Sequence, residues 1–185
     1  MLSWWILDIG LLVIIIFLFL LLSMFWPPDS PWAPWWRTNK KIARAMCRLA
    51  KITKKDVVYD LGCGDGTALS VAAGEFGARG VGIEIDPLRS FFSAIRFRIN
   101  GLNKKVKIIK NNFNDVNISE ASVIFVYLVP RALERLKPKL RKELKGETLL
   151  VSYRYKANLP LVGYDKENNV YLHKIKAGDS VFNSI

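Results

Sequence analysis

The stretch that decides the fold is VVYDLGCGDG, residues 57–66. Its first half, residues 57–61, is a short run of apolar and β-branched side chains that predicts a buried strand. Glycines at every second position then let the backbone pass close to a ligand, because no Cβ atom stands in the way. Residues 66–76 predict a helix, and the free N–H groups at its start favour a carboxylate or a phosphate. The order of strand, glycine turn and helix therefore predicts a ligand site at residues 60–66.

The rest of the chain alternates in the same way. A helix at 39–51, with Thr38 as its cap, precedes the first strand. Further helices are predicted at 87–100 and 131–144, and further strands at 80–85, 106–110, 122–128, 147–155 and 169–176. Strands that alternate with helices predict an α/β fold, here a Rossmann-like, mostly parallel sheet with helices on both faces.

A membrane anchor is predicted at the N-terminus. Residues 9–26 carry no charge, and as a helix these 18 residues would be about 27 Å long, close to the thickness of a bilayer core. Tryptophans lie on both sides of this run, as in two interfacial belts: Trp4, Trp5, Trp26, Trp32, Trp35 and Trp36. A cleaved signal peptide fits less well, because no basic segment precedes the run and no small-x-small site follows it. The predicted organisation is an anchor at 1–26, a Pro/Trp-rich connector at 27–37 and one domain at 38–185.

Charge gives the predicted orientation. The chain has 28 Lys and Arg against 16 Asp and Glu, a net charge of +12, and eight of the basic residues lie between 37 and 55 with no acid among them. The positive-inside rule then keeps the domain in the cytoplasm, and anionic lipid head groups are a further expected partner. Nucleic acid is the competing explanation for such a charge and is not expected here. Two cysteines and one histidine predict neither a disulfide framework nor a metal site.

Three kinds of ligand could use the glycine turn. A dinucleotide site needs G-x-G-x-x-G, but the third glycine comes one residue early, at Gly66, and Thr67 follows it. A phosphate-binding P-loop needs Gly-Lys-Ser/Thr, which is absent. The form D-x-G-x-G-x-G, with acids at Asp60 and Asp65, resembles motif I of the class I S-adenosylmethionine-dependent methyltransferases. This resemblance implies S-adenosylmethionine as the cofactor.

Positions after the next two strands extend the predicted cofactor site. Glu84 ends the second strand, where a carboxylate can accept hydrogen bonds from both hydroxyls of a ribose. Asp86 is expected to form a turn or a helix cap before Pro87. After the third strand, Asn112 stands where the methyltransferase pattern often has Asp, and Phe113 can contact adenine or lie in the core. The predicted cofactor-binding residues are Asp60, Gly62, Cys63, Gly64, Asp65, Gly66, Glu84, Ile85, Asn112 and Phe113.

Acceptor-side candidates follow the fourth and fifth strands. They are Tyr127, Pro130 and Arg154, with Asp115 as a weaker one. The Asn/Asp-Pro-Pro-Tyr form used on exocyclic base amines is absent, which argues against a DNA adenine methyltransferase. No general base is evident, since the single histidine, His173, lies in a late strand and is expected to be structural.

Taken in order, the segments resemble one family. An N-terminal apolar helix, a Pro-aromatic-x-Pro stretch at 31–34, a basic helix, VVYDLGCGDG, GVGIEIDP, VIFVYLVPRALERLKPKL and ETLLVSYRY are similar to the small membrane-anchored, seven-strand methyltransferases that methylate lysines of membrane proteins. The resemblance implies a protein lysine as acceptor, in a plasma membrane by default. The chain departs from the pattern by lacking an evident seventh strand. Alternatives are a lipid, quinone or other small acceptor, a nicotinamide-dependent oxidoreductase, and a non-catalytic nucleoside-binding module.

Overall fold

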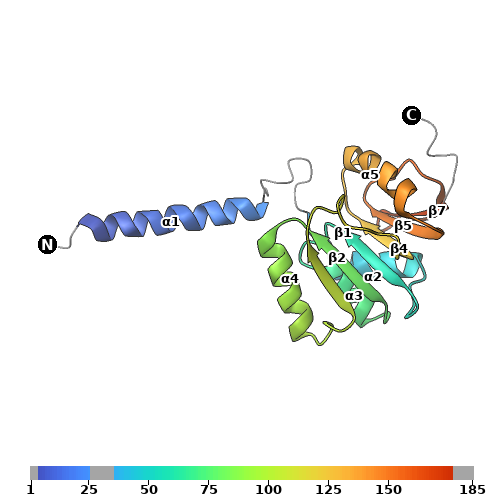
Figure 1. The fold of residues 1–185 in the computed structure, drawn as a ribbon, viewed down its shortest axis with the longest axis horizontal. Coiled ribbons are helices and arrows are strands. Elements are labelled where there is room, and N and C mark those ends of the chain that lie inside the picture. The colour runs from blue at the N-terminus through green and yellow to red at the C-terminus, as the bar shows by residue number, and fades with distance from the viewer. Residues whose placement is uncertain (1–3, 26–35, 177–185) are drawn as a thin grey trace. The chain divides into compact units, whose positions relative to one another are not determined.

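The computed structural model describes residues 4–25 and 36–176 and divides the chain into two compact units, Met1–Trp35 and Trp36–Ile185. The first unit contains helix α1 (Trp4–Phe25), drawn in blue in Figure 1. Its segment Trp5–Leu22 is exposed throughout and is long and apolar enough to cross a membrane. The helix starts before the predicted Ile9, and most of the predicted connector lies outside the described residues.

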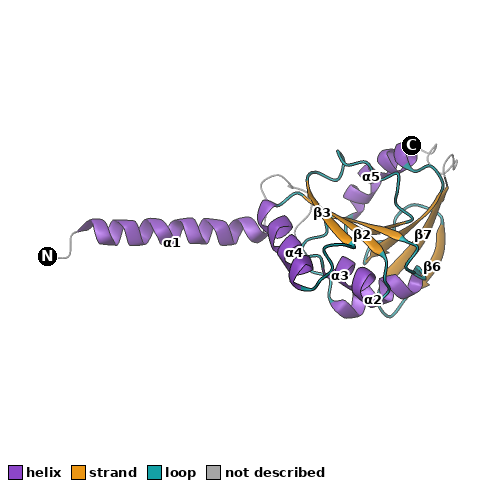
Figure 2. Ribbon diagram, turned by 60° about the horizontal axis from the view of Figure 1, so that its bottom comes forward, coloured by secondary structure: helices purple, strands orange, loops and turns teal. Residues whose placement is uncertain are grey.

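The second unit is built on a seven-stranded sheet (Figure 2). Its strands follow the order β3-β2-β1-β4-β5-β7-β6, and only β7 runs against the others. The strands are β1 (Val57–Leu61), β2 (Arg79–Glu84), β3 (Val106–Lys110), β4 (Val123–Val126), β5 (Glu147–Tyr153), β6 (Leu161–Asp165) and β7 (Val170–Lys176). Because β1 lies in the middle with β2 and β4 beside it, the carboxyl ends of these parallel strands meet at one edge.

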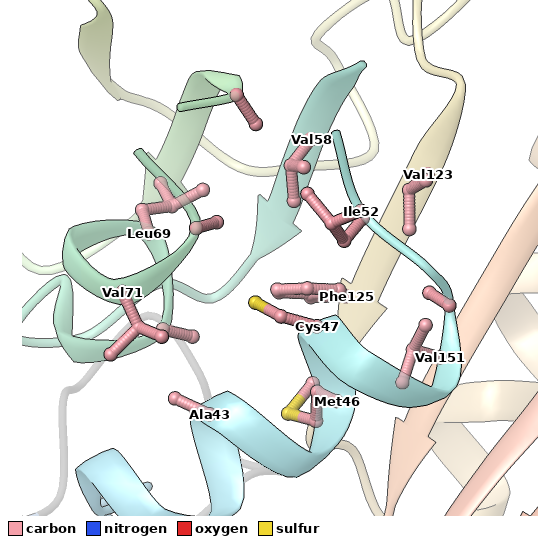
Figure 3. Close-up of a cluster of buried hydrophobic side chains, with 14 of the residues drawn as sticks. Ala43, Met46, Cys47, Ile52, Val58, Leu69, Val71, Val123, Phe125 and Val151 are labelled. Carbon is pink, nitrogen blue, oxygen red and sulfur yellow. The ribbon is translucent and has the colours of Figure 1, made fainter. Parts of the chain in front are cut away.

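Helices cover both faces of the sheet, and the alternation of side chains along β1 shows how. Val58 points into a core shared with α2 (Lys40–Leu49), α3 (Thr67–Gly74) and Phe97 of α4 (Pro87–Ile99); Figure 3 shows part of this cluster. Tyr59 and Leu61 point into a second core under α5 (Pro130–Glu143). The predicted α/β fold with helices on both faces is confirmed.

Two details differ from the sequence predictions. A seventh strand does exist: β6 pairs with β7 at the edge of the sheet. Its side chains are mostly exposed and a bulge lies between Leu161 and Gly163, so the sequence shows no alternation of buried and exposed residues there. The cap of α2 is Asn39, whose Oδ1 accepts the N–H of Ile42 at 2.9 Å, and the prediction of Thr38 was wrong by one residue.

His173 is structural, as expected. It lies buried in β7, where Nε2 accepts the N–H of Ala157 at 3.3 Å and Nδ1 lies 3.1 Å from the carbonyl oxygen of Leu159. A carbonyl only accepts, so Nδ1 carries the hydrogen. Burial lowers the pKa of this imidazole, which keeps it neutral while it fastens the segment between β5 and β6 to the sheet.

Candidate functional site

The glycine turn between β1 and α3 has the backbone shape that its sequence predicts. Gly62, Gly64 and Gly66 have φ angles of 86°, 55° and 73°, in the left-handed region that other residues avoid. Gly66 is also the N-cap of α3, and a Cβ atom there would lie 2.7 Å from the ring of Phe97. The alternate glycines are therefore required by both conformation and space.

Helix α4 holds this turn from one side. The hydroxyl of Ser93 donates to the carbonyl oxygen of Gly64 at 2.6 Å, and Arg96 Nη1 donates to the carbonyl oxygen of Asp65 at 2.8 Å. Together with Phe97 these residues lie three or four positions apart and share one face of the helix. Neither Ser93 nor Arg96 was identified from the sequence. The available signal was that spacing of small, basic and aromatic residues opposite an apolar stripe.

Glu84 connects β2 to the turn. Its side chain is 4% exposed, Oε2 accepts the N–H of Gly64 at 2.8 Å, and Oε1 accepts the N–H of Asp86 at 3.0 Å. Burial raises the pKa of Glu84, although both N–H groups oppose the rise. Each carboxylate oxygen keeps a second lone pair, so the group is fixed in place and can still accept from a ligand. Asp86 caps α4 by accepting the N–H of Arg89 at 2.8 Å, as predicted.

Asp60 lies at the end of β1 and is 8% exposed. No hydrogen bond within residues 36–176 reaches its carboxylate. Burial, with added repulsion from Glu84 and Asp65, raises the pKa of Asp60 to about 7. A buried acid of this kind gains most from a cationic ligand, because a cation offsets both causes of the shift.

Asp65 serves a different purpose in the same turn. It accepts the N–H and the hydroxyl of Thr67 at 3.0 and 2.7 Å, and it forms ion pairs with Arg37 at 2.7 Å and Arg96 at 3.3 Å. Burial alone would raise its pKa, but the hydrogen bonds from Thr67 and the two guanidinium groups lower it. Asp65 therefore stays ionised and stabilises the turn.

Other predicted cofactor residues lie around this centre. The Cys63 side chain is buried in the core against β2, where burial raises the pKa of its thiol. Ile85 is half-buried between Glu84 and Asp86. Asn112 is half-buried after β3, and its Oδ1 accepts the N–H of Asn114 at 3.0 Å. Phe113 packs against the second core. Their contacts with a cofactor stay predictions.

An aromatic cluster lies beyond the ends of β4 and β5. We define it as Trp36, Tyr127, Tyr153 and Tyr155. The rings of Trp36 and Tyr127 are 5.7 Å apart, those of Tyr127 and Tyr153 are 4.5 Å apart, and Trp36 stacks on Tyr155 at 6.3 Å. Pro130, the third acceptor-side candidate, is exposed at the start of α5.

Arg154, which has a φ of 69°, adds a cation to the aromatic cluster. Its Cζ lies 5.0 Å from the centre of the Trp36 ring, and its Nη1 donates to the Tyr127 hydroxyl at 3.4 Å. Burial raises the pKa of Tyr127, so this phenol stays neutral. Two of the predicted acceptor-side residues are thus brought into contact.

Trp36 corrects one sequence interpretation. Its position in the sequence places it in a membrane-interface belt, but its ring packs on Tyr127 and Tyr155 of the domain. The next residue, Arg37, pairs with Asp65. The last two residues of the predicted connector therefore reach both the glycine turn and the aromatic cluster. Their proximity in sequence to other tryptophans concealed this role.

The sheet order, the glycine turn and the acid at the end of β2 define a class I S-adenosylmethionine-dependent methyltransferase. A solved RNA methyltransferase from Salinibacter ruber, in complex with S-adenosyl-L-homocysteine, has a TM-score of 0.72 and 34% identity, over 78% of this chain and 95% of that one. The YjhP structure from E. coli, with a TM-score of 0.59 and 18% identity over 71% of this chain and 57% of that one, shares the fold.

Residues 60–159 match the ANTKMT methyltransferase domain, and the chain belongs to this family. It is 41% identical to a protein-lysine N-methyltransferase of Saccharolobus islandicus, over 71% of this chain and 81% of that protein. It is 26% identical to an ATP synthase lysine N-methyltransferase of Xenopus laevis, over 68% of this chain and 53% of that protein. The chain thus spans about half the length of this vertebrate relative.

The residues at the glycine turn fit the cofactor of this class. S-adenosylmethionine carries a sulfonium and an ammonium group, and the turn offers two buried carboxylates whose pKa values burial raises, Asp60 and Glu84. A cation there relieves the repulsion between them. The open side of the turn agrees, since a Cβ atom at Gly62 would meet nothing within 4 Å.

Replacing Gly66 with Ala should lower the free energy of unfolding by roughly 2–4 kcal/mol, because strain at a positive φ adds to the clash with Phe97. Gly146→Ala is the matched control, since a Cβ atom there meets nothing within 4 Å, and it should change stability by less than about 1 kcal/mol. Denaturant unfolding of both variants measures the difference. Equal stability of the two would contradict the described shape of the turn.

Asp60→Asn should affect stability and cofactor affinity in opposite directions. The folded-state pKa of about 7 lies above the ordinary value of 3.8, so the folded protein holds the extra proton between these values and loses stability as the pH rises through them. The asparagine variant should therefore be more stable than the parent at pH 8, by roughly 1–4 kcal/mol without ligand.

The same change should weaken S-adenosylmethionine binding at pH 8, by about tenfold or more. In the parent, affinity should fall as the pH drops below about 7, because protonation removes the charge that attracts the cofactor. Calorimetric titrations between pH 6 and 8 measure both effects. An affinity that is flat over this range, or unchanged in the variant, would show that Asp60 does not face the cofactor's cationic end.

Proposed function

We propose that this enzyme methylates the side-chain amine of lysine in membrane-associated proteins. The observation that carries the proposal is the aromatic cluster with Arg154, which lies beyond the ends of β4 and β5 where an acceptor meets the cofactor in this class. Relatives named as protein-lysine methyltransferases support the same acceptor.

In this proposal the glycine turn holds the amino-acid end of S-adenosylmethionine. Asp60 faces its positive charge, Glu84 accepts from the ribose hydroxyls, and Asn112 and Phe113 lie beside the adenine. When bound, the cofactor supplies an activated methyl group. The chain's own residues then have to present a neutral amine along the right line.

The aromatic cluster can favour a neutral amine without a general base. A lysine with a reference pKa of about 10.4 is charged in water at neutral pH. Entering between the rings of Trp36 and Tyr127, it loses solvent, and the guanidinium of Arg154 repels its charged form. Both effects lower the lysine pKa. The oxygen of Tyr127 accepts a bond from Arg154 and has a lone pair left for an amine N–H, which orients the nitrogen.

Helix α1 supports a membrane-associated acceptor. It is long and apolar enough to span a bilayer, and we propose that it anchors the chain with the domain on the cytoplasmic side. Trp36 and Arg37 lie at the aromatic cluster and the glycine turn, only eleven residue steps after Phe25, or at most about 40 Å of extended chain. Anchoring would therefore keep the acceptor side near the bilayer and raise the local concentration of membrane proteins.

RNA is the second candidate acceptor. The Salinibacter ruber structure is described as an RNA methyltransferase, and this chain has a net charge of +12. Against it, the described residues that follow β4 offer a crowded group of rings with a bound guanidinium rather than an open platform for a base. A test of acceptors should include RNA for this reason.

Membrane extracts incubated with the enzyme and an isotope-labelled methyl donor should yield label on lysine side chains, read by mass spectrometry of peptides, lipids and RNA in parallel. Trp36→Ala should reduce kcat/KM for a lysine peptide by about tenfold or more while cofactor affinity stays within about twofold. Tyr164→Ala is the control, because Tyr164 forms a stacked pair with Tyr171 on the edge strand β6. Label confined to lipid or RNA would refute the lysine proposal.

Deleting residues 1–30 tests the anchor separately. Cofactor affinity should stay within about twofold, because Trp36 and Arg37 remain, whereas labelling of membrane proteins should fall by about tenfold or more. A soluble lysine peptide, which needs no anchoring, serves as the matched acceptor and should be labelled as before. Equal loss with both acceptors would contradict a role for α1 in bringing the enzyme to its substrate.

A further inference from the structure

Helix α4 has its apolar residues on the outside. Its buried residues are Arg89, Ser90, Ser93 and Phe97, three of them polar. Its outer face carries Phe91, Phe92, Ile95 and Ile99, which are 59%, 58%, 38% and 79% exposed. A surface helix of a soluble domain normally shows the reverse. These four side chains, which we call the α4 stripe, recur at helical spacing and form one contiguous row.

The surroundings of the α4 stripe are basic without exception. From residue 87 to residue 114 the chain has seven Lys and Arg and no Asp or Glu. Among them, Arg98 is exposed on α4, and Lys104, Lys105, Lys107 and Lys110 are exposed in the following turn and on β3. Because β3 is the edge strand of the sheet and α4 packs against it, these charges lie on the same side of the domain as the stripe (Figure 1).

We propose that α4 is a second membrane contact, lying in the surface of an anionic bilayer with the α4 stripe inserted. Large apolar residues on one face, flanked by Lys and Arg, are the features by which an amphipathic helix lies at a membrane interface. Each basic group near an anionic surface adds attraction, and none of residues 87–114 opposes it. The inference rests on the membrane location proposed above, although its test does not need α1.

The bilayer explains the α4 stripe better than the other occupants do. RNA would use the charges but not a row of aliphatic and aromatic side chains that includes Ile95 and Ile99. A second copy of the domain would bury the stripe but would bring two basic surfaces together. An anionic lipid surface satisfies both the apolar row and the charge.

A membrane contact at α4 would also act on the cofactor site. The inner face of the same helix donates from Ser93 to Gly64 and from Arg96 to Asp65, and it places Phe97 against Gly66. Insertion of the outer face would fix the orientation of the helix that holds the glycine turn. The domain would then be both tethered and oriented on the surface.

The experiment uses the chain lacking residues 1–30, so that α1 contributes nothing. Trp36–Ile185 form a separate compact unit, and the Salinibacter ruber structure, 95% of which this chain covers, is a folded chain of similar extent. Co-sedimentation is measured with vesicles of phosphatidylcholine alone and of phosphatidylcholine with phosphatidylglycerol. The protein should bind the anionic vesicles and bind the neutral ones much less.

The double variant Phe92→Ser/Ile95→Ser should reduce binding to anionic vesicles by about tenfold or more. The matched control is Leu161→Ser/Val162→Ser, which removes two exposed apolar side chains from β6 at the other edge of the sheet and should leave binding unchanged. S-adenosylhomocysteine binding in all variants shows that α4 still holds the glycine turn.

Failure to bind anionic vesicles, or equal losses in the two double variants, would overturn the proposal. So would a dimer in sedimentation velocity that the α4 variant dissolves, which would assign the stripe to a second copy, or loss of labelled RNA binding in place of vesicle binding. Loss of lysine methylation by deletion of residues 1–30, with vesicle binding retained, concerns the function of α1 and leaves the α4 contact standing.

Discussion

One hydrogen-bonded carboxylate organises the site. Glu84, buried at the end of β2, accepts the N–H of Gly64 in the glycine turn and the N–H of Asp86 at the start of α4. It thereby joins two strand ends and a helix at the edge of the sheet where β1 and β2 stop side by side. Removing the carboxylate would leave two buried N–H groups unpaired as well as removing a ligand-binding group. The rest of the cofactor site depends on this connection.

Charge is divided between two tasks around that connection. Asp65, with its two guanidinium partners and the bonds from Thr67, is kept ionised and holds the turn closed. Asp60 has no such partner among the described residues, and burial raises its pKa. Two acids five residues apart therefore behave differently because one has been neutralised by the fold and the other waits for a ligand cation. Such divergent pKa values are common at functional sites.

Local patterns in the sequence predicted the fold and the centre of the site, because short-range rules govern both. Alternate glycines after a buried strand imply the turn, and Asp86 before Pro87 implies the helix cap that the structure contains. Contacts between distant segments were not predictable in this way. Ser93 and Arg96 reach the turn across about thirty residues, and Trp36 packs on Tyr127 from the other end of the domain. Strand β6 was missed because an exposed edge strand has no buried face to give it a pattern.

A structure of the protein with S-adenosylhomocysteine tests the central claim most directly. We predict that the ribose hydroxyls lie within hydrogen-bond distance of the Glu84 carboxylate and that the amino-acid end of the ligand lies beside Asp60, with Asp65 still paired to Arg37 and Arg96. A nucleoside bound away from the glycine turn, or a Glu84 carboxylate that makes no contact with the sugar, would contradict this claim.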